Sequence, residues 1–246
     1  MKNKIMREFM RLTKYENLEP SPQKLGLPMP SLELPLEKGA ELIDLPPGEN
    51  IHLGKVDLVQ LVEKRETLRK YLDKPLTLEE LSFLLWGTQG VKLIDKKSRT
   101  KRTVPSAGSR HSFETYLLVN DVTGLSPGLY RYMALSHQLA RLPGRENIKG
   151  TLTEACLKQQ HVKTSAVTFA WAAVPHRTVW RYSQRGYRYL YLDAGHVCQN
   201  LYLLAEAIDC GVCAIAAFDD DLANQAIGLD GEDLFVIYLA SVGKRK

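Results

Sequence analysis

The chain has 246 residues, enough to bury a sizeable core as one large domain or as two small ones. Its formal net charge of +5 is not gathered into one basic block, and its 44% hydrophobic and 25% charged residues are ordinary, so the composition indicates no nucleic-acid partner. No apolar run reaches the ~18 residues of a membrane span, and residues 1–15 lack the apolar centre of a secretory signal, so we expect a cytoplasmic protein with no membrane partner.

The first fifty residues carry more than half of the twelve prolines. Proline disfavours helix interiors and central strands, so residues 1–50 are predicted to form an extended arm and residues 51–246 the folded domain. The sequence leaves open whether this arm wraps a partner subunit or is loose.

Two helices are predicted after the arm. Apolar residues at helical spacing indicate the first over residues 56–64. Thr77 and Glu80 form a capping box that opens the second, which we expect to stop at Gly87 or Gly90.

The remaining chain mixes strands and helices without strict alternation. Apolar and β-branched runs predict strands over residues 114–120, 129–132, 166–174, 211–218 and 234–242. The longest helix is predicted over residues 188–208, because apolar side chains recur there every three or four positions, and a short helix over 222–227. This pattern predicts an α+β fold rather than a doubly wound sheet.

The segment from Arg65 to Tyr71 is a candidate anion site. In extended backbone, side chains alternate faces, so Arg65, Thr67 and Arg69 share one side and Glu66 points away from them. Two guanidinium groups that flank a hydroxyl can bind the oxygens of a phosphate. The alternative is a solvated basic strand edge.

The run Pro105-Ser106-Ala107-Gly108 is a second candidate. Small residues allow backbone to approach a flat ring closely, and Ser106 offers a hydroxyl; the alternative is a plain turn. After it, Arg110 and His111 are candidates to face a substrate.

Three further groups of residues are weighed as candidates for a functional site. The pair Cys210 and Cys213 has redox spacing, but no second ligand pair completes a zinc site, so we expect buried, inert thiols. His196, one helical turn from Asp193, is interpreted as structural rather than catalytic. The aromatic and arginine side chains of residues 180–189 could wall an active site or pack a dimer.

In their order and spacing, residues 65–71, 105–108 and 193–220 resemble the nitroreductase-like flavoproteins, and more closely the SagB/ThcOx-type dehydrogenases. The resemblance extends from about Leu53 to the C-terminus. It implies a nitroreductase-like fold that binds FMN, with a central, mostly antiparallel sheet flanked by helices. It also implies an intertwined homodimer with the flavin site at the subunit interface.

The resemblance further implies roles for individual residues. Arg65, Thr67 and Arg69 match positions that hold the FMN phosphate and ribitol, while Glu66 stands where many members have a second arginine. The run Pro105, Ser106, Ala107 and Gly108 matches a loop that packs on flavin bound mainly by the other subunit. The remaining matches are Ala216 and Ala217, which pass over the flavin with a backbone N–H toward N5, and Lys244 or Arg245, basic contacts to the phosphate.

By resemblance, the expected function is FMN-dependent oxidoreduction by ping-pong hydride transfer through flavin N5, with NAD(P)H as one candidate donor and a small-molecule or peptide substrate. A first alternative is oxidation of azolines to azoles together with a separate cyclodehydratase. A second is a flavin-binding protein without turnover of its own, and a third is a basic, non-enzymatic binding module.

Overall fold

The computed structural model describes residues 3–96 and 99–246. Seven strands form one sheet in the order β1-β6-β5-β4-β7-β9-β8, and each neighbouring pair is antiparallel. These strands are β1 (Glu41–Asp44), β4 (Phe113–Val119), β5 (Gly128–Met133), β6 (Gln138–Leu142), β7 (Val167–Ala173), β8 (Cys210–Ile215) and β9 (Phe235–Lys244). A separate two-stranded sheet pairs β2 (Val91–Ile94) with β3 (Thr100–Arg102).

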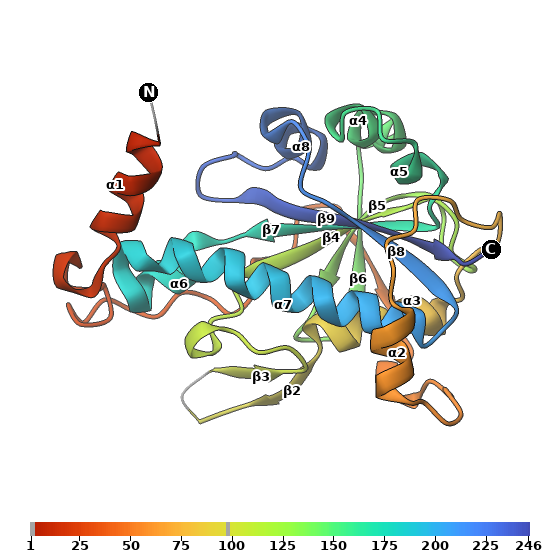
Figure 1. Cartoon of the computed structure of the whole chain (residues 1–246), viewed down its shortest axis with the longest axis horizontal. Coiled ribbons are helices and arrows are strands. Elements are labelled where there is room, and N and C mark those ends of the chain that lie inside the picture. Colours follow the sequence, from red (N-terminus) through yellow and green to blue (C-terminus); the bar gives the residue numbers. More distant parts are fainter. Residues whose placement is uncertain (1–2, 97–98) are drawn as a thin grey trace.

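Helices cover both faces of the large sheet (Figure 1), with α3 and α7 on one face and α4, α5 and α8 on the other. The helices are α1 (Lys4–Leu12), α2 (Leu58–Lys64), α3 (Leu78–Gln89), α4 (Ile148–Ala155), α5 (Gln160–Thr164), α6 (Pro175–Tyr182), α7 (Gly186–Glu206) and α8 (Asp220–Ile227). An antiparallel sheet between helical layers confirms the predicted α+β class. No helix in the described ranges combines the length and the apolar character that crossing a bilayer requires.

The sheet separates two hydrophobic cores. Every residue of the central strands β4 and β7 is buried, so these strands are mostly apolar on both faces, with Glu114, Thr115 and Thr168 as buried polar exceptions. Successive side chains alternate between the cores: Leu117 and Phe169 pack toward α3 and α7, and Leu118 and Ala170 pack toward α4 and α8. This double burial explains why β4 and β7 are recognisable as largely apolar runs.

Several local predictions are confirmed. The Glu80 N–H donates to the Thr77 hydroxyl at 3.2 Å and the Thr77 N–H to the Glu80 carboxylate at 2.9 Å, which is the expected capping box. The helix it opens ends at Gln89, before Gly90. The long helix α7 begins and ends two residues earlier than predicted. The strands β1, β2, β3 and β6 and the helices α1, α4, α5 and α6 were not predicted.

The proline-rich N-terminal segment is held by its own chain, which answers the question whether it is loose. Buried Arg177 donates to the Ser31 carbonyl at 2.9 Å, and buried Arg131 donates to the Pro35 carbonyl at 2.7 Å. The segment then adds β1 to the edge of the sheet beside β6. A domain boundary at residue 50 stays a prediction.

The first helix is attached differently. Arg188 of α7 donates to the Thr13 hydroxyl at 2.6 Å, and Arg185 donates to the Thr13 carbonyl at 2.7 Å. No residue of α1 is buried, and its apolar residues Ile5 and Met6 are exposed. The helix is therefore fixed at its C-terminal end alone.

Candidate functional site

The segment from Arg65 to Tyr71 lies along the free edge of β8. Thr67 forms a parallel bridge with Val212, and the Leu68 N–H donates to the Val212 carbonyl at 2.9 Å. A Cβ atom on Gly211 would lie 2.3 Å from a methyl carbon of Leu68, so glycine is required for this close approach. The edge of the sheet thus positions the candidate anion site.

Two of the predicted phosphate ligands meet on α7. The Arg65 guanidinium stacks over the ring of Tyr202, 5.4 Å from its centroid, and the Thr67 hydroxyl lies 3.1 Å from the Tyr202 hydroxyl. The Tyr202 hydroxyl also accepts the Ala214 N–H at 3.0 Å. Sequence reasoning missed Tyr202, because one tyrosine among many on an amphipathic helix has no distinguishing signal.

Arg69 is exposed and lies near buried Cys213. Burial raises the pKa of the Cys213 thiol, and the Arg69 guanidinium offsets part of that effect. Among residues 3–96 and 99–246, no ion pair involves Arg65 or Arg69. Their charges are therefore free to bind an anion, so these residues fit a phosphate group.

The C-terminal cations are already paired. Lys244 contacts the Glu80 carboxylate, and Arg245 contacts Glu66 at 2.6 Å and also Glu206. Glu66 is turned toward Arg245 rather than Tyr202, as the alternation of side chains predicts. A direct role of Lys244 or Arg245 at the phosphate stays a prediction.

The Pro-Ser-Ala-Gly loop is anchored to the middle of α7. The Ser106 hydroxyl donates to the buried Asp193 carboxylate at 2.6 Å, and the Ala107 N–H donates to it at 3.1 Å. Burial raises the pKa of the Asp193 carboxyl, and the hydrogen bond from Ser106 works against that rise. Gly108 has a φ of +59°, and a Cβ there would lie 2.5 Å from the Tyr182 hydroxyl. Asp193 thus holds the loop, a role that its spacing from His196 did not suggest.

Ala216 lies at the wall of a cavity of about 500 Å³. The cavity is lined by Ala194 and Gly195 of α7, next to Asp193, and by Tyr191 and Tyr238. The chain covers about 7 Å between Ala214, bound by Tyr202, and Ala216, since each extended residue spans about 3.3 Å. The cavity therefore lies close to both the phosphate-binding candidates and the anchored loop.

Not every candidate faces this region. Arg110 is buried over the ring of Trp180, 5.3 Å from its centroid, and His111 is buried as well, so the expectation that both face a substrate is wrong. Burial lowers the pKa of His111 to about 3. His196 is half exposed, with its Nδ1 3.9 Å from the Asp193 carboxylate.

The cysteines are buried and free, as expected for inert thiols. Burial raises the pKa values of Cys198 and Cys210 to about 12. Within the described part of the chain, no group of histidine, cysteine and acidic residues could hold a metal ion.

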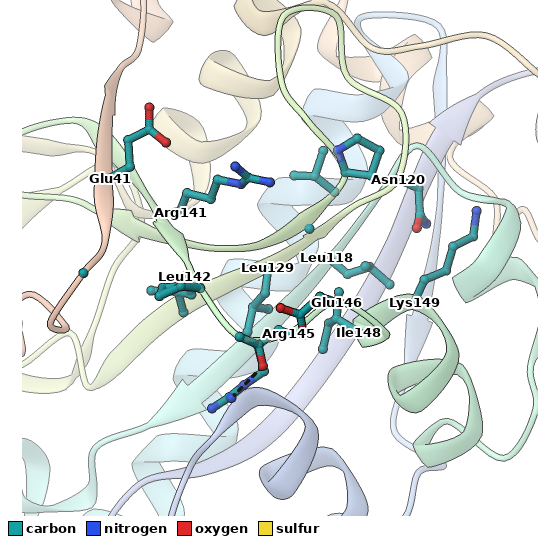
Figure 2. Close-up of a pocket in the computed structure, with 16 residues that line it drawn as sticks. Glu41, Leu118, Asn120, Leu129, Arg141, Leu142, Arg145, Glu146, Ile148 and Lys149 are labelled. Carbon is teal, nitrogen blue, oxygen red and sulfur yellow. Dashed lines mark hydrogen bonds between the residues drawn. The ribbon is translucent and has the colours of Figure 1, made fainter.

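A second cavity, of about 510 Å³, lies elsewhere (Figure 2). Glu41 and Arg141 lie at one side of it, and Asn120 and Lys149 at the other. It mixes both signs of charge and contains none of the predicted site residues. We therefore assign the functional site to the region around α7 and β8.

Known proteins resemble this chain over most of its length. A sequence model described as the Nitroreductase family matches residues 62–244. A protein of Methanocaldococcus jannaschii that is named as a nitroreductase is 37% identical over 203 residues, which are 82% of this chain and 96% of that protein.

Two further relatives are longer than this chain. The trifolitoxin-processing protein TfxB of Rhizobium leguminosarum is 26% identical over 167 residues, 65% of this chain but 45% of that protein. A crystal structure from Anabaena variabilis, described as that of a nitroreductase, is 29% identical with a TM-score of 0.71. The match covers 85% of this chain and 42% of that one.

Proposed function

The chain belongs to the nitroreductase family, and from that premise we propose that it is an FMN-dependent oxidoreductase. One observation carries the proposal. Arg65 and Arg69, two guanidinium groups with no carboxylate partner among the residues that the structure describes, flank Thr67 at the edge strand that leads to the cavity at Ala216. This arrangement suits a ligand with an anionic tail and a flat, largely apolar ring.

Each group of residues has its own part in holding the cofactor. Arg65, Thr67 and Arg69 would bind the phosphate, and the loop of residues 105–108 would pack against the ring. Ala216 and Ala217 would offer backbone N–H groups, for which small side chains suffice. The bound flavin would supply hydride transfer at N5 in a ping-pong cycle between a donor, for which NAD(P)H is one candidate, and an unidentified acceptor.

We further propose that two copies of the chain complete the site. Tyr191 and Leu192 of α7, next to the cavity, are 63% and 59% exposed, and Val59 of α2 is 74% exposed. Large apolar side chains on neighbouring helices mark surfaces that associate with a partner. A homodimer with the flavin at its interface would cover them.

The relative named for trifolitoxin processing supports a second candidate, oxidation of azolines to azoles in a peptide with a separate cyclodehydratase. Since this chain spans less than half of that protein, the likeness suggests a substrate class and no more. A flavin-binding protein without turnover is the third candidate.

The test begins with purified protein loaded with FMN. We expect a yellow protein of dimeric mass, whose flavin absorbance is bleached by NADH or NADPH without oxygen and restored by a quinone. Bleaching by neither nucleotide, with bleaching by an azoline peptide, would favour the second candidate. Bound flavin that no donor reduces would favour the third, and protein that stays colourless with added FMN would refute the proposal.

A further inference from the structure

Beyond β8 the chain runs through Ala216 to the start of α8 at Asp220 without a strand partner. The last residue of α4 and the connection from α4 to α5 each hold this stretch in one place. The Gln159 side-chain amide donates to the Ala217 carbonyl at 2.8 Å, and the Asp219 N–H donates to the Ala155 carbonyl at 2.8 Å. In Figure 1, α4, α5 and α8 lie together on the face of the sheet opposite α7.

The connection itself has an unusual backbone. Leu157 and Lys158 are consecutive non-glycine residues with φ of +55° and +61°. Such left-handed conformations are unfavourable for residues with a Cβ and persist where surrounding contacts fix them. Gln159 follows directly, so its side chain projects from a loop of defined shape.

His161 fixes the orientation of that side chain. Its ring is buried, with Nε2 3.2 Å from the Gln159 amide oxygen and Nδ1 3.0 Å from the Ser241 hydroxyl. An amide oxygen only accepts, so Nε2 must carry the proton and Nδ1 must accept from Ser241. With its oxygen held by His161, Gln159 presents its NH₂ group to Ala217.

The same network reaches the anion-binding segment. The Tyr71 hydroxyl lies 2.8 Å from the buried Ser241 hydroxyl, and Tyr71 is two residues beyond Arg69. Burial lowers the pKa of His161, and the nearby Arg69 guanidinium lowers it further, so the ring stays neutral as its acceptor role requires. A chain of hydrogen bonds therefore joins the segment of residues 65–71 to Ala217.

We propose that Gln159, oriented by His161, is a positioning residue that holds the Ala216–Ala217 backbone where it meets the flavin ring. This inference rests on the function proposed above, and it assigns Gln159 no chemical step. Its consequence is that Gln159 lies at the ring end of this hydrogen-bond network, beyond the buried His161 and Ser241. Displacing Gln159 should therefore affect the ring contact without weakening the phosphate contact.

The test uses the full chain and two variants. Gln159→Glu keeps an acceptor for His161 but cannot donate to Ala217, and Gln159→Ala removes the side chain without adding charge. Gln160→Glu is the matched control, since Gln160 is the next residue, is exposed, and its side chain bonds only the Lys158 carbonyl among the described contacts. Amide hydrogen exchange of residues 215–220 is measured without flavin, followed by the FMN dissociation constant and the visible spectrum of bound flavin.

We expect both Gln159 variants to speed exchange at residues 215–220 about fivefold, as the loss of one neutral hydrogen bond allows, and to shift the flavin spectrum while FMN affinity stays within about twofold. Gln160→Glu should match the wild type. Unchanged exchange in both Gln159 variants, or equal effects in the control, would overturn the inference. A wild-type protein that binds no FMN defeats the proposed function instead, while the exchange measurement still decides whether Gln159 holds the segment.

Discussion

The Ser106 hydroxyl donates a 2.6 Å hydrogen bond to the buried carboxylate of Asp193, and this bond joins the Pro-Ser-Ala-Gly loop to the middle of the longest helix. The same hydroxyl accepts the His111 N–H at 2.9 Å. One small side chain thus fixes both ends of the turn that follows Pro105.

Replacing Ser106 with alanine should destabilise the protein by about 2 kcal/mol, because it leaves the buried Asp193 with one donor fewer and the His111 N–H without its acceptor. Urea unfolding measures the change. Ser109→Ala is the matched control, since the Ser109 hydroxyl has no hydrogen bond among those of the described residues. Equal stability of the two variants would show that the Asp193 contact does not hold the loop.

Gly108→Ala should lower the free energy of unfolding more than a glycine-to-alanine change at an uncrowded position of positive φ. Gly108 has φ of +59° and meets the Tyr182 hydroxyl, whereas Gly124 has φ of +85° and an added Cβ there would meet nothing within 4 Å. Gly124→Ala should cost about 1 kcal/mol from backbone strain alone, and Gly108→Ala roughly 1–3 kcal/mol more from crowding. Each kcal/mol should lower Tm by about 2–4 °C, which calorimetry measures. A similar Tm for both variants would contradict the packing of Tyr182 on the loop.

Arg65→Ala and Arg69→Ala should each weaken FMN binding roughly 10- to 100-fold, because each removes a charge-assisted hydrogen bond of about 1.5–3 kcal/mol. The double variant should fold normally and be isolated colourless, since neither side chain is buried. Titration with FMN, followed by fluorescence, gives the dissociation constants. Lys70→Ala, which removes the same charge from the exposed residue between Arg69 and Tyr71, should bind FMN as the wild type does. Retention of stoichiometric FMN by the double variant would exclude the phosphate assignment.

Glu66→Gln should tighten FMN binding by up to about fivefold, since an exposed charge of this kind contributes roughly 0.2–1 kcal/mol. The change removes a negative charge beside the proposed phosphate site and leaves Arg245 paired with Glu206. Glu63→Gln on α2 is the charge-matched control and should change affinity less. Weaker binding by Glu66→Gln would mean that its ion pair with Arg245 supports the site rather than opposing it.

Stability should fall in mild acid partly through His111. Burial lowers the pKa of its ring to about 3, and the Arg102 guanidinium adds to the effect. Because the unfolded ring titrates near 6.5, the unfolded state binds the extra proton between about pH 6.5 and pH 3, and the free energy of unfolding decreases across that window by up to ~1.4 kcal/mol per pH unit.

His111→Asn tests this effect, since asparagine tolerates the φ of +44° at that position. Urea unfolding between neutral pH and about pH 4 should show a smaller loss of stability in the variant than in the wild type. Parallel loss in both proteins would indicate that His111 is already protonated in the native state. His161 is also buried, but it is present in both proteins, so its contribution to the loss of stability in acid cancels when the two are compared.

The elements that could be predicted from the sequence are those whose signal lies within a few neighbouring residues. Thr77 and Glu80 form hydrogen bonds with each other within one turn, and the runs at β4 and β7 are mostly apolar because both faces are buried. The missed strand β1 lies in the proline-rich segment, and only its pairing with β6 makes it a strand. The missed β6 has only five residues and carries the exposed Arg141 among its buried ones, so its apolar signal is weaker.

By itself, the sequence determined the α+β class and the order of the main elements, because these depend on local backbone chemistry and on apolar periodicity. Residues 65–71, 105–108 and 216–217 were singled out by their resemblance to a family, and their role at a flavin stays a proposal. Only the tertiary structure decided which of them have partners. Asp193 anchors the loop, Tyr202 receives Arg65 and Thr67, and carboxylates neutralise Lys244 and Arg245. These contacts join residues far apart in the chain, and they exist because burying both faces of one sheet brings α7, β8 and the loop together.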